Sequence, residues 1–148
     1  MIRAARTEDL EQIARLFNDY RVWYRKEPDL PGAAEFIKSR LLQNDSVIYV
    51  SENNGILNGF TQLYPLFSST RMRKSWLLND LFVSPEFRGK GISKALLDAA
   101  KKHCIDTDAA GLLLETEKTN IIGNQLYPAA GFELYDETNF YWWANNFK

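Results

Sequence analysis

The sequence has little of what would mark a disulfide scaffold, a metal centre or a nucleic-acid coat protein. Among 148 residues there is one cysteine, Cys104, and one histidine, His103, so an internal disulfide is excluded and a metal site is not expected. Lys and Arg number 18 against 19 Asp and Glu, and the missing basic excess argues against nucleic acid as a partner. No apolar run reaches the ~20 residues of a membrane span, and the first residues lack the apolar core of a signal peptide. We therefore expect a cytoplasmic protein that binds no metal, no nucleic acid and no membrane.

The composition is that of one ordinary globular domain. Hydrophobic residues make up 45% and charged residues 25% of the chain. A chain of this length can bury a core without a disulfide or a metal to hold it together. No stretch rich in proline, glycine and serine separates one part of the chain from another. We predict a single domain over residues 1–148.

The spacing of apolar residues predicts both helices and strands. Apolar positions three and four residues apart predict helices at residues 10–20, 33–41, 92–100 and 121–130. Runs rich in β-branched and aromatic residues predict strands at residues 2–6, 46–51, 56–66, 75–83, 112–116, 132–135 and 139–143. The pair Asn54-Gly55 predicts a hairpin turn. The fold class is therefore α+β (α/β), with about four helices packed on a mixed central sheet of about seven strands.

One stretch carries a signal for anion binding. A hydrophobic strand ending at Val83 leads to the turn Arg88-Gly89-Lys90-Gly91, which opens an amphipathic helix. The first N–H groups of a helix have no internal partner, and glycine lets a phosphate approach the backbone, so this turn would hold a pyrophosphate. Arg88, Lys90 and Lys94 add positive charge. A Walker loop and the three-glycine dinucleotide fingerprint do not fit, and a plain strand-to-helix turn remains the alternative.

A second stretch places two polar side chains on one helical face. Asn120 and Tyr127 are seven residues apart, which is close to two helical turns. Taken alone, this spacing is more typical of a capping asparagine followed by a core tyrosine than of a functional pair.

Together the two stretches resemble the GNAT family of N-acetyltransferases. The family's first signature, Arg/Gln-x-x-Gly-x-Gly/Ala, reads here as residues 88–93, Arg-Gly-Lys-Gly-Ile-Ser. Its second signature reads here as Asn120, then the pair at residues 126–127, Leu-Tyr, then Gly-Phe at residues 131–132. Residues 60–65 and 79–83 look like a small-molecule branch of the family, related to fungal histone-like and amino-acid acetyltransferases. The resemblance covers the chain from Ile2 to Trp143 and implies a GNAT-like acyl-CoA N-acyltransferase fold.

The resemblance also implies a co-substrate, acetyl-CoA, and a role for each matching residue. The backbone of Phe82 and Val83 would meet the pantetheine arm and the thioester. Asn120 would contact the same arm, and Tyr127 would protonate the departing thiolate. The pyrophosphate would be held by the turn and the start of the helix, that is by Arg88, Gly89, Lys90, Gly91, Ile92 and Ser93. Pro128 follows Tyr127 directly, so the helix is expected to kink or end there.

The acceptor side is less defined. A primary amine has a pKa of about 10.4 and needs a base, and Asp80 is the nearest carboxylate candidate, since Asn79 cannot act as one. Asp80 should point away from the useful strand face unless a bulge intervenes. A water chain to Glu115 or Glu117 is an alternative, as is a purely structural Asp80.

The leading hypothesis is an enzyme that moves an acetyl group directly to a primary amine of a small molecule, such as an amino acid or a polyamine. One alternative is acetylation of protein lysines or N-termini, and another is a CoA-binding module without catalysis. Residues 140–143, Phe-Tyr-Trp-Trp, place apolar groups on both faces of one expected strand and suggest a homodimer.

Overall fold

The computed structural model describes residues 1–146, and the chain divides into two units, Met1–Glu115 and a second that begins at Thr116. Among the described residues, the first unit contains five strands, three α-helices and two short 3-10 helices. In chain order these are β1 (Ile2–Ala4), η1 (Thr7–Asp9), α1 (Leu10–Trp23), α2 (Leu30–Gln43), β2 (Val47–Asn53), β3 (Ile56–Ser68), β4 (Arg73–Val83), η2 (Pro85–Phe87), α3 (Ile92–Asp106) and β5 (Leu112–Leu114).

The five strands form one mixed sheet in the order β1-β2-β3-β4-β5. Neighbouring strands are antiparallel except β4 and β5, which run parallel because α3 carries the chain back between them. The turn between β2 and β3 has Asn54 and Gly55 at φ of 52° and 80°, which confirms the hairpin predicted from this pair.

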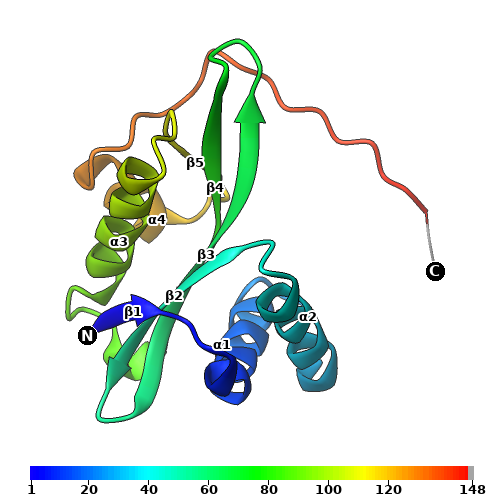
Figure 1. Cartoon of the computed structure of the whole chain (residues 1–148), viewed down its shortest axis with the longest axis vertical. Helices are drawn as coiled ribbons and strands as arrows, with labels where there is room; N and C mark the ends of the chain where they lie inside the picture. Colours follow the sequence, from blue (N-terminus) through cyan, green and yellow to red (C-terminus); the bar gives the residue numbers. More distant parts are fainter. Residues whose placement is uncertain (147–148) are drawn as a thin grey trace. The chain divides into compact units, whose positions relative to one another are not determined.

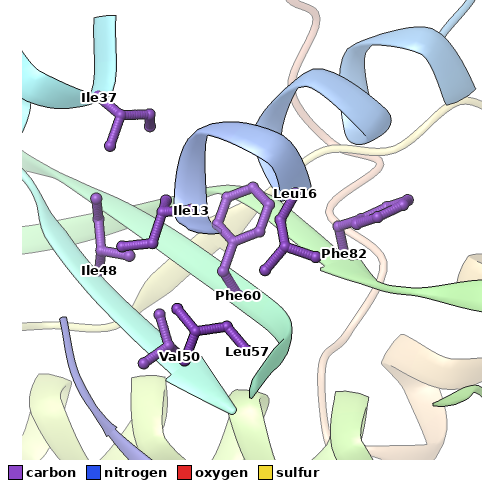
Figure 2. Packing of buried hydrophobic residues seen from close by; sticks show 8 residues of the cluster. All are labelled: Ile13, Leu16, Ile37, Ile48, Val50, Leu57, Phe60 and Phe82. Atoms are coloured by element: carbon purple, nitrogen blue, oxygen red, sulfur yellow. The ribbon is translucent and has the colours of Figure 1, made fainter. Parts of the chain in front are cut away.

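Helices cover both faces of the sheet: α1 and α2 lie over one face and α3 over the other (Figure 1). The helices and the strands beneath them all contribute apolar side chains to the core under α1 and α2. Figure 2 shows Phe60 of β3 between Ile13 and Leu16 of α1. The buried cluster comprises Ile13, Leu16, Ile37, Ile48, Val50, Leu57, Phe60 and Phe82. Two buried polar residues, Gln62 and Asp80, interrupt this apolar face close to Phe60 and Phe82.

The second unit contains one described helix, α4 (Ile121–Ala129). With it the expected four helices and the α+β class are confirmed for the described residues. The expectation of about seven strands is wrong, because residues 132–135 and 139–143 form no strand. A strand exists only where a second strand accepts its hydrogen bonds, and the aromatic pattern of these residues does not provide one. The N–H of Phe132 donates instead to the carbonyl of Tyr127 and closes the end of α4.

Within residues 1–146 no helix is both long enough and apolar enough to cross a bilayer.

Candidate active site

The central strand β4 loses its partner on one side halfway along its length. β5 pairs only with Trp76–Leu78, and from Asn79 to Val83 no strand of the described part of the chain pairs with that edge of β4. On its other edge β4 stays paired with β3 as far as Val83, opposite Gly59. Backbone groups near the end of β4 are therefore offered along an open edge.

A β-bulge begins at the point where the pairing with β5 stops. Leu63 lies opposite Leu78 and Gln62 lies opposite Asp80, so Asn79 is an extra residue in β4. The bulge shifts the alternation of the strand and places Asp80 beside Gln62, on the face of the sheet that carries Phe60 and Phe82. The sequence places Asp80 on the other face of the strand unless a bulge intervenes, and the structure has such a bulge next to Asp80.

Asp80 is a buried carboxyl group with two amide donors. It is 3% exposed. Oδ2 accepts a hydrogen bond of 2.6 Å from Gln62 Nε2, and Oδ1 accepts one of 3.1 Å from Asn79 Nδ2. Burial raises the pKa of Asp80, and hydrogen bonding from Gln62 and Asn79 opposes the rise, with a smaller contribution from the nearby Tyr20 hydroxyl. A carboxylate with a raised pKa is a stronger base than one in water.

The aromatic side chain of Tyr20, from α1, lies next to this carboxyl group. The Tyr20 ring meets those of Phe60 and Phe82 edge-on, with centroids 6.0 and 6.1 Å apart, and the Tyr24 ring is 5.0 Å from it. The Tyr20 hydroxyl donates to the Asn79 carbonyl at 3.1 Å. Burial raises the pKa of Tyr20 and the Asp80 charge adds to it, so Tyr20 stays protonated. Asp80 is therefore an acidic group next to a cluster of aromatic rings.

The turn before α3 has the geometry expected for an anion site. Gly89 and Gly91 have φ of 77° and 80°, which residues with a Cβ rarely adopt, and no atom would meet a Cβ at either position. Gly91 is the N-cap of α3, no side chain caps the helix, and its first turn contains no acidic residue. Within residues 1–146, the N–H groups from Gly89 to Lys94 donate to no protein acceptor. An array of unused donors at a helix N-terminus suits a negatively charged group.

The three basic residues of this region have local partners. Arg88 Nε donates to the Val83 carbonyl at 2.9 Å, which ties the turn to the end of β4. Lys90 Nζ lies 5.2 Å from the centre of the Phe87 ring, and Lys94 pairs with Asp98 at 3.0 Å. The main-chain donors therefore remain the most available groups of the turn.

The second unit contains the other two predicted residues. Asn120 is the N-cap of α4: its Oδ1 accepts from Gly123 N at 3.1 Å and its Nδ2 donates to Thr116 Oγ1 at 2.8 Å. The sequence predicts that the helix kinks or ends at Tyr127; it does not end there, because α4 continues through Pro128 to Ala129. The Tyr127 ring contacts Phe132 edge-on at 6.1 Å.

The structure brings part of the predicted set together. Asp80, Phe82, Val83 and residues 88–93 share the first unit, at the end of β4 and the start of α3, whereas Asn120 and Tyr127 belong to the second unit. Sequence reasoning missed Gln62, the side-chain partner of Asp80. A glutamine amid strand-forming residues was the available signal, but only the strand register shows its neighbour.

Known proteins with similar sequences identify the family. A sequence model described as the acetyltransferase (GNAT) family matches residues 10–132. The chain belongs to this family. It is 48% identical over 139 residues to an uncharacterized N-acetyltransferase, YhfO, of Bacillus subtilis (strain 168), covering 94% of this chain and 92% of that protein. It is 26% identical to a probable acetyltransferase of Haemophilus influenzae, over 85% of each chain. The crystal structure of a probable acetyltransferase superposes with a TM-score of 0.94 at 31% identity, covering 100% of this chain and 99% of the other.

The protein is thus an N-acetyltransferase of the GNAT family, whose members take the acetyl group from acetyl-CoA. The residues present fit that co-substrate. The unused N–H donors from Gly89 to Lys94 match an anionic pyrophosphate, and the open edge of β4 from Asn79 to Val83 can pair with amide groups of an extended arm.

Proposed function

We propose that the protein transfers the acetyl group of acetyl-CoA directly to a primary amine of a small molecule, such as an amino acid or a polyamine. The observation that carries the proposal is the row of unused N–H donors between Gly89 and Lys94, next to the open edge of β4. The same strand carries a buried carboxyl group, Asp80, and Phe82, whose ring contacts that of Tyr20 from α1; an amine would be received here.

The co-substrate would be held mainly by the backbone. The N–H groups of Gly89, Lys90, Gly91, Ile92 and Ser93 would bind the pyrophosphate, and Arg88 would keep the turn against β4 through its bond to Val83. Phe82 and Val83 would offer backbone groups to the pantetheine arm, and a backbone N–H near Val83 would stabilise negative charge on the acyl oxygen. Asn120 would contact the same arm.

Two side chains would move protons. When bound, acetyl-CoA supplies an acetyl group activated as a thioester. Asp80 would accept a proton from the incoming ammonium group, directly or through water, because its raised pKa makes it an effective base. As the amine nitrogen bonds to the acetyl carbon and the carbon–sulfur bond breaks, Tyr127 would donate its hydroxyl proton to the departing sulfur. Tyr127 would regain a proton from the nitrogen, which loses a second proton to become the amide. A neutral amine and a protonated thiol are both required, so the two roles are complementary.

The features around Asp80 favour a small cationic acceptor. A positively charged amine is attracted by the faces of aromatic rings and by a carboxylate; Tyr20 lies next to Asp80, and the Tyr24 ring contacts that of Tyr20. We place the chain in the small-molecule branch that resembles fungal histone-like and amino-acid acetyltransferases, and we propose that residues 1–148 act as one domain and that two copies form a homodimer. A cytoplasmic location stays a prediction.

A screen of amine acceptors tests the proposal. Release of free thiol from acetyl-CoA is followed with amino acids, polyamines and lysine peptides as acceptors. Turnover with small amines supports the proposed class, turnover with peptides alone favours a protein acetyltransferase, and CoA binding without any turnover favours the non-catalytic module.

The variant Tyr127→Phe tests the acid. We expect a loss of roughly 100-fold or more in kcat with unchanged affinity for CoA in calorimetry, because general acid catalysis contributes about 10²–10⁴-fold. The matched control is Tyr135→Phe, which removes the hydroxyl of an exposed tyrosine in the same unit and should leave kcat unchanged. Wild-type turnover in Tyr127→Phe would remove the acid role.

A further inference from the structure

A row of buried polar side chains crosses three neighbouring strands and ends on Asp80. Ser46, immediately before β2, donates from Oγ to Gln62 Oε1 at 2.8 Å, and Gln62 of β3 donates from Nε2 to Asp80 Oδ2 at 2.6 Å. The three residues are 9%, 0% and 3% exposed. The register explains their alignment, since Gln62 lies opposite Asp80 on one side and opposite Ile48, two residues after Ser46, on the other.

We propose that Gln62 is a positioning residue, which Ser46 holds in place and which fixes the orientation of the Asp80 carboxyl group for proton transfer. The inference rests on the proposed function, in which Asp80 is the base. A buried amide is costly unless both its ends are hydrogen-bonded, and here one end is bound by Ser46 and the other by Asp80. Because the serine donates to the amide oxygen, the amide can present only its N–H side to Asp80.

The second carboxyl oxygen of Asp80, Oδ1, faces the side from which we expect a substrate to arrive. Oδ2 is bound to the fully buried Gln62, whereas Oδ1 is bound to Asn79, which is exposed at the bulge. Gln62 thus holds the inner oxygen and leaves the outer one for proton exchange through the surface. The hydrogen bond from Gln62 to Oδ2 favours the ionised form of the carboxyl group, because an amide N–H can only donate.

Other groups also lie near the carboxyl group. Tyr20 approaches from α1 and Tyr64 from β3, and both stay protonated because burial and the Asp80 charge raise the pKa of each hydroxyl. Arg40 and Asp45 act on Tyr64 with opposite signs. Asn79 donates from β4 itself. None of these groups replaces the donor that Gln62 supplies to Oδ2.

The variant Gln62→Met tests the proposal, because it keeps the length and shape of the side chain and removes the donor. Loss of a donor to the ionised form raises the pKa of Asp80, so its ionisation and the acid limb of kcat/KM should both move to higher pH. The ionisation is followed by NMR of the aspartate carboxyl carbons, with the Asp80 signal assigned by its absence in Asp80→Asn. At neutral pH we expect a loss of roughly tenfold in kcat, with little change in KM.

Two further variants separate positioning from simple stability. Thr61→Val removes a buried hydrogen bond of 2.7 Å to the Asp80 carbonyl, so it weakens the same strand pair without touching the carboxyl group. It should lower the free energy of unfolding and leave the Asp80 titration unchanged. Ser46→Ala removes only the anchor of Gln62, and it should move the titration in the same direction by a smaller amount, also if Gln62→Met does not fold.

The outcomes distinguish this inference from the proposed function. An Asp80 titration in Gln62→Met or Ser46→Ala that matches wild type, or one that Thr61→Val moves equally, would overturn the positioning role. If Asp80→Asn abolishes turnover in that case, Asp80 remains the base and only the positioning role is lost. Wild-type turnover in Asp80→Asn would overturn the base, and the positioning role with it.

Discussion

At the scale of single residues, glycine 91 links stability to co-substrate binding. Its φ of 80° would be strained in alanine by about 1–2 kcal/mol, although no atom blocks a Cβ. We predict that Gly91→Ala lowers the free energy of unfolding by about 1 kcal/mol in urea denaturation, since alanine also restricts the unfolded chain. The backbone would relieve this strain by rotating, which would turn the N–H groups at the start of α3 away from the pyrophosphate. Affinity for CoA in calorimetry should therefore fall roughly tenfold, about 1.4 kcal/mol.

Glycine 111 provides the matched control. It also has no atom near a Cβ, but it is not at positive φ, so Gly111→Ala should leave both stability and CoA affinity close to wild type. Loss of stability in Gly91→Ala without loss of CoA affinity would contradict the role of this turn in binding.

Residue identities that follow from local chemistry were predictable, and those that depend on strand register were not. The turn at residues 88–91 follows from glycines and basic residues before an amphipathic helix. The partner of Asp80 is 18 residues away along the chain, and the bulge at Asn79 brings the two side chains together. No local pattern encodes that pairing.

At the scale of elements, two ion pairs of Arg3 connect the start of the chain to the sheet. Arg3 of β1 binds both carboxylate oxygens of Asp9 at 2.8 and 2.9 Å, and it also binds Glu52 of β2 at 2.9 Å. Asp9 is buried and accepts the Arg6 N–H as well. The hydrogen bonds from Arg3 hold the pKa of Asp9 below its usual range.

We predict that Arg3→Met destabilises the fold by about 3 kcal/mol at neutral pH, because it leaves a buried carboxylate without its partner. In wild type the folded-state pKa of Asp9 lies below the unfolded one, so its contribution is complete at neutral pH and is lost as the pH falls through the folded pKa. Without Arg3, burial would raise that pKa instead, and the variant should approach wild type as the pH falls toward about 4. Urea denaturation between pH 7 and pH 4 measures the difference.

Arg15→Met is the control for this prediction. Arg15 pairs with Glu11 on the exposed face of α1, and such pairs contribute little, so the change should stay within about 0.5 kcal/mol. An equal loss in Arg3→Met and Arg15→Met would show that burial of the pair does not matter.

Elements with a local signature were found from the sequence, whereas elements that need a distant partner were not. The predicted strands at 46–51, 56–66 and 75–83 correspond to β2, β3 and β4, whose apolar residues are buried under the helices. The segments at 132–135 and 139–143 have the same kind of composition but form no ladder. Side-chain pattern describes a surface that can be buried, and hydrogen-bond partners decide whether a strand forms.

At the scale of the whole molecule, the predicted roles depend on residues of both units. The family match at residues 10–132 crosses the boundary at residue 115, so one family model includes both the turn at residues 88–93 and Tyr127. Physical arguments from the sequence predict the turn and the helix that carries Tyr127, but they do not link the two. The resemblance to a family links them, and for this reason a full set of roles could be predicted without knowing the geometry.

The four aromatic residues 140–143 lead to the prediction for the assembly. Each is at least 70% exposed in the single chain, and Tyr141 and Trp142 reach 90%. Contiguous apolar surface of this kind is typical of an interface, and burial of such side chains is favourable by about 1.5–3 kcal/mol each.

We predict that the protein sediments as a homodimer and that the double substitution Trp142→Ser with Trp143→Ser shifts it to the monomer in analytical ultracentrifugation. Phe67→Ser, at an exposed aromatic residue of β3, should leave the mass unchanged. A wild-type protein that stays monomeric up to about 100 μM, a concentration at which a Kd of that size would still populate the dimer, would contradict the homodimer.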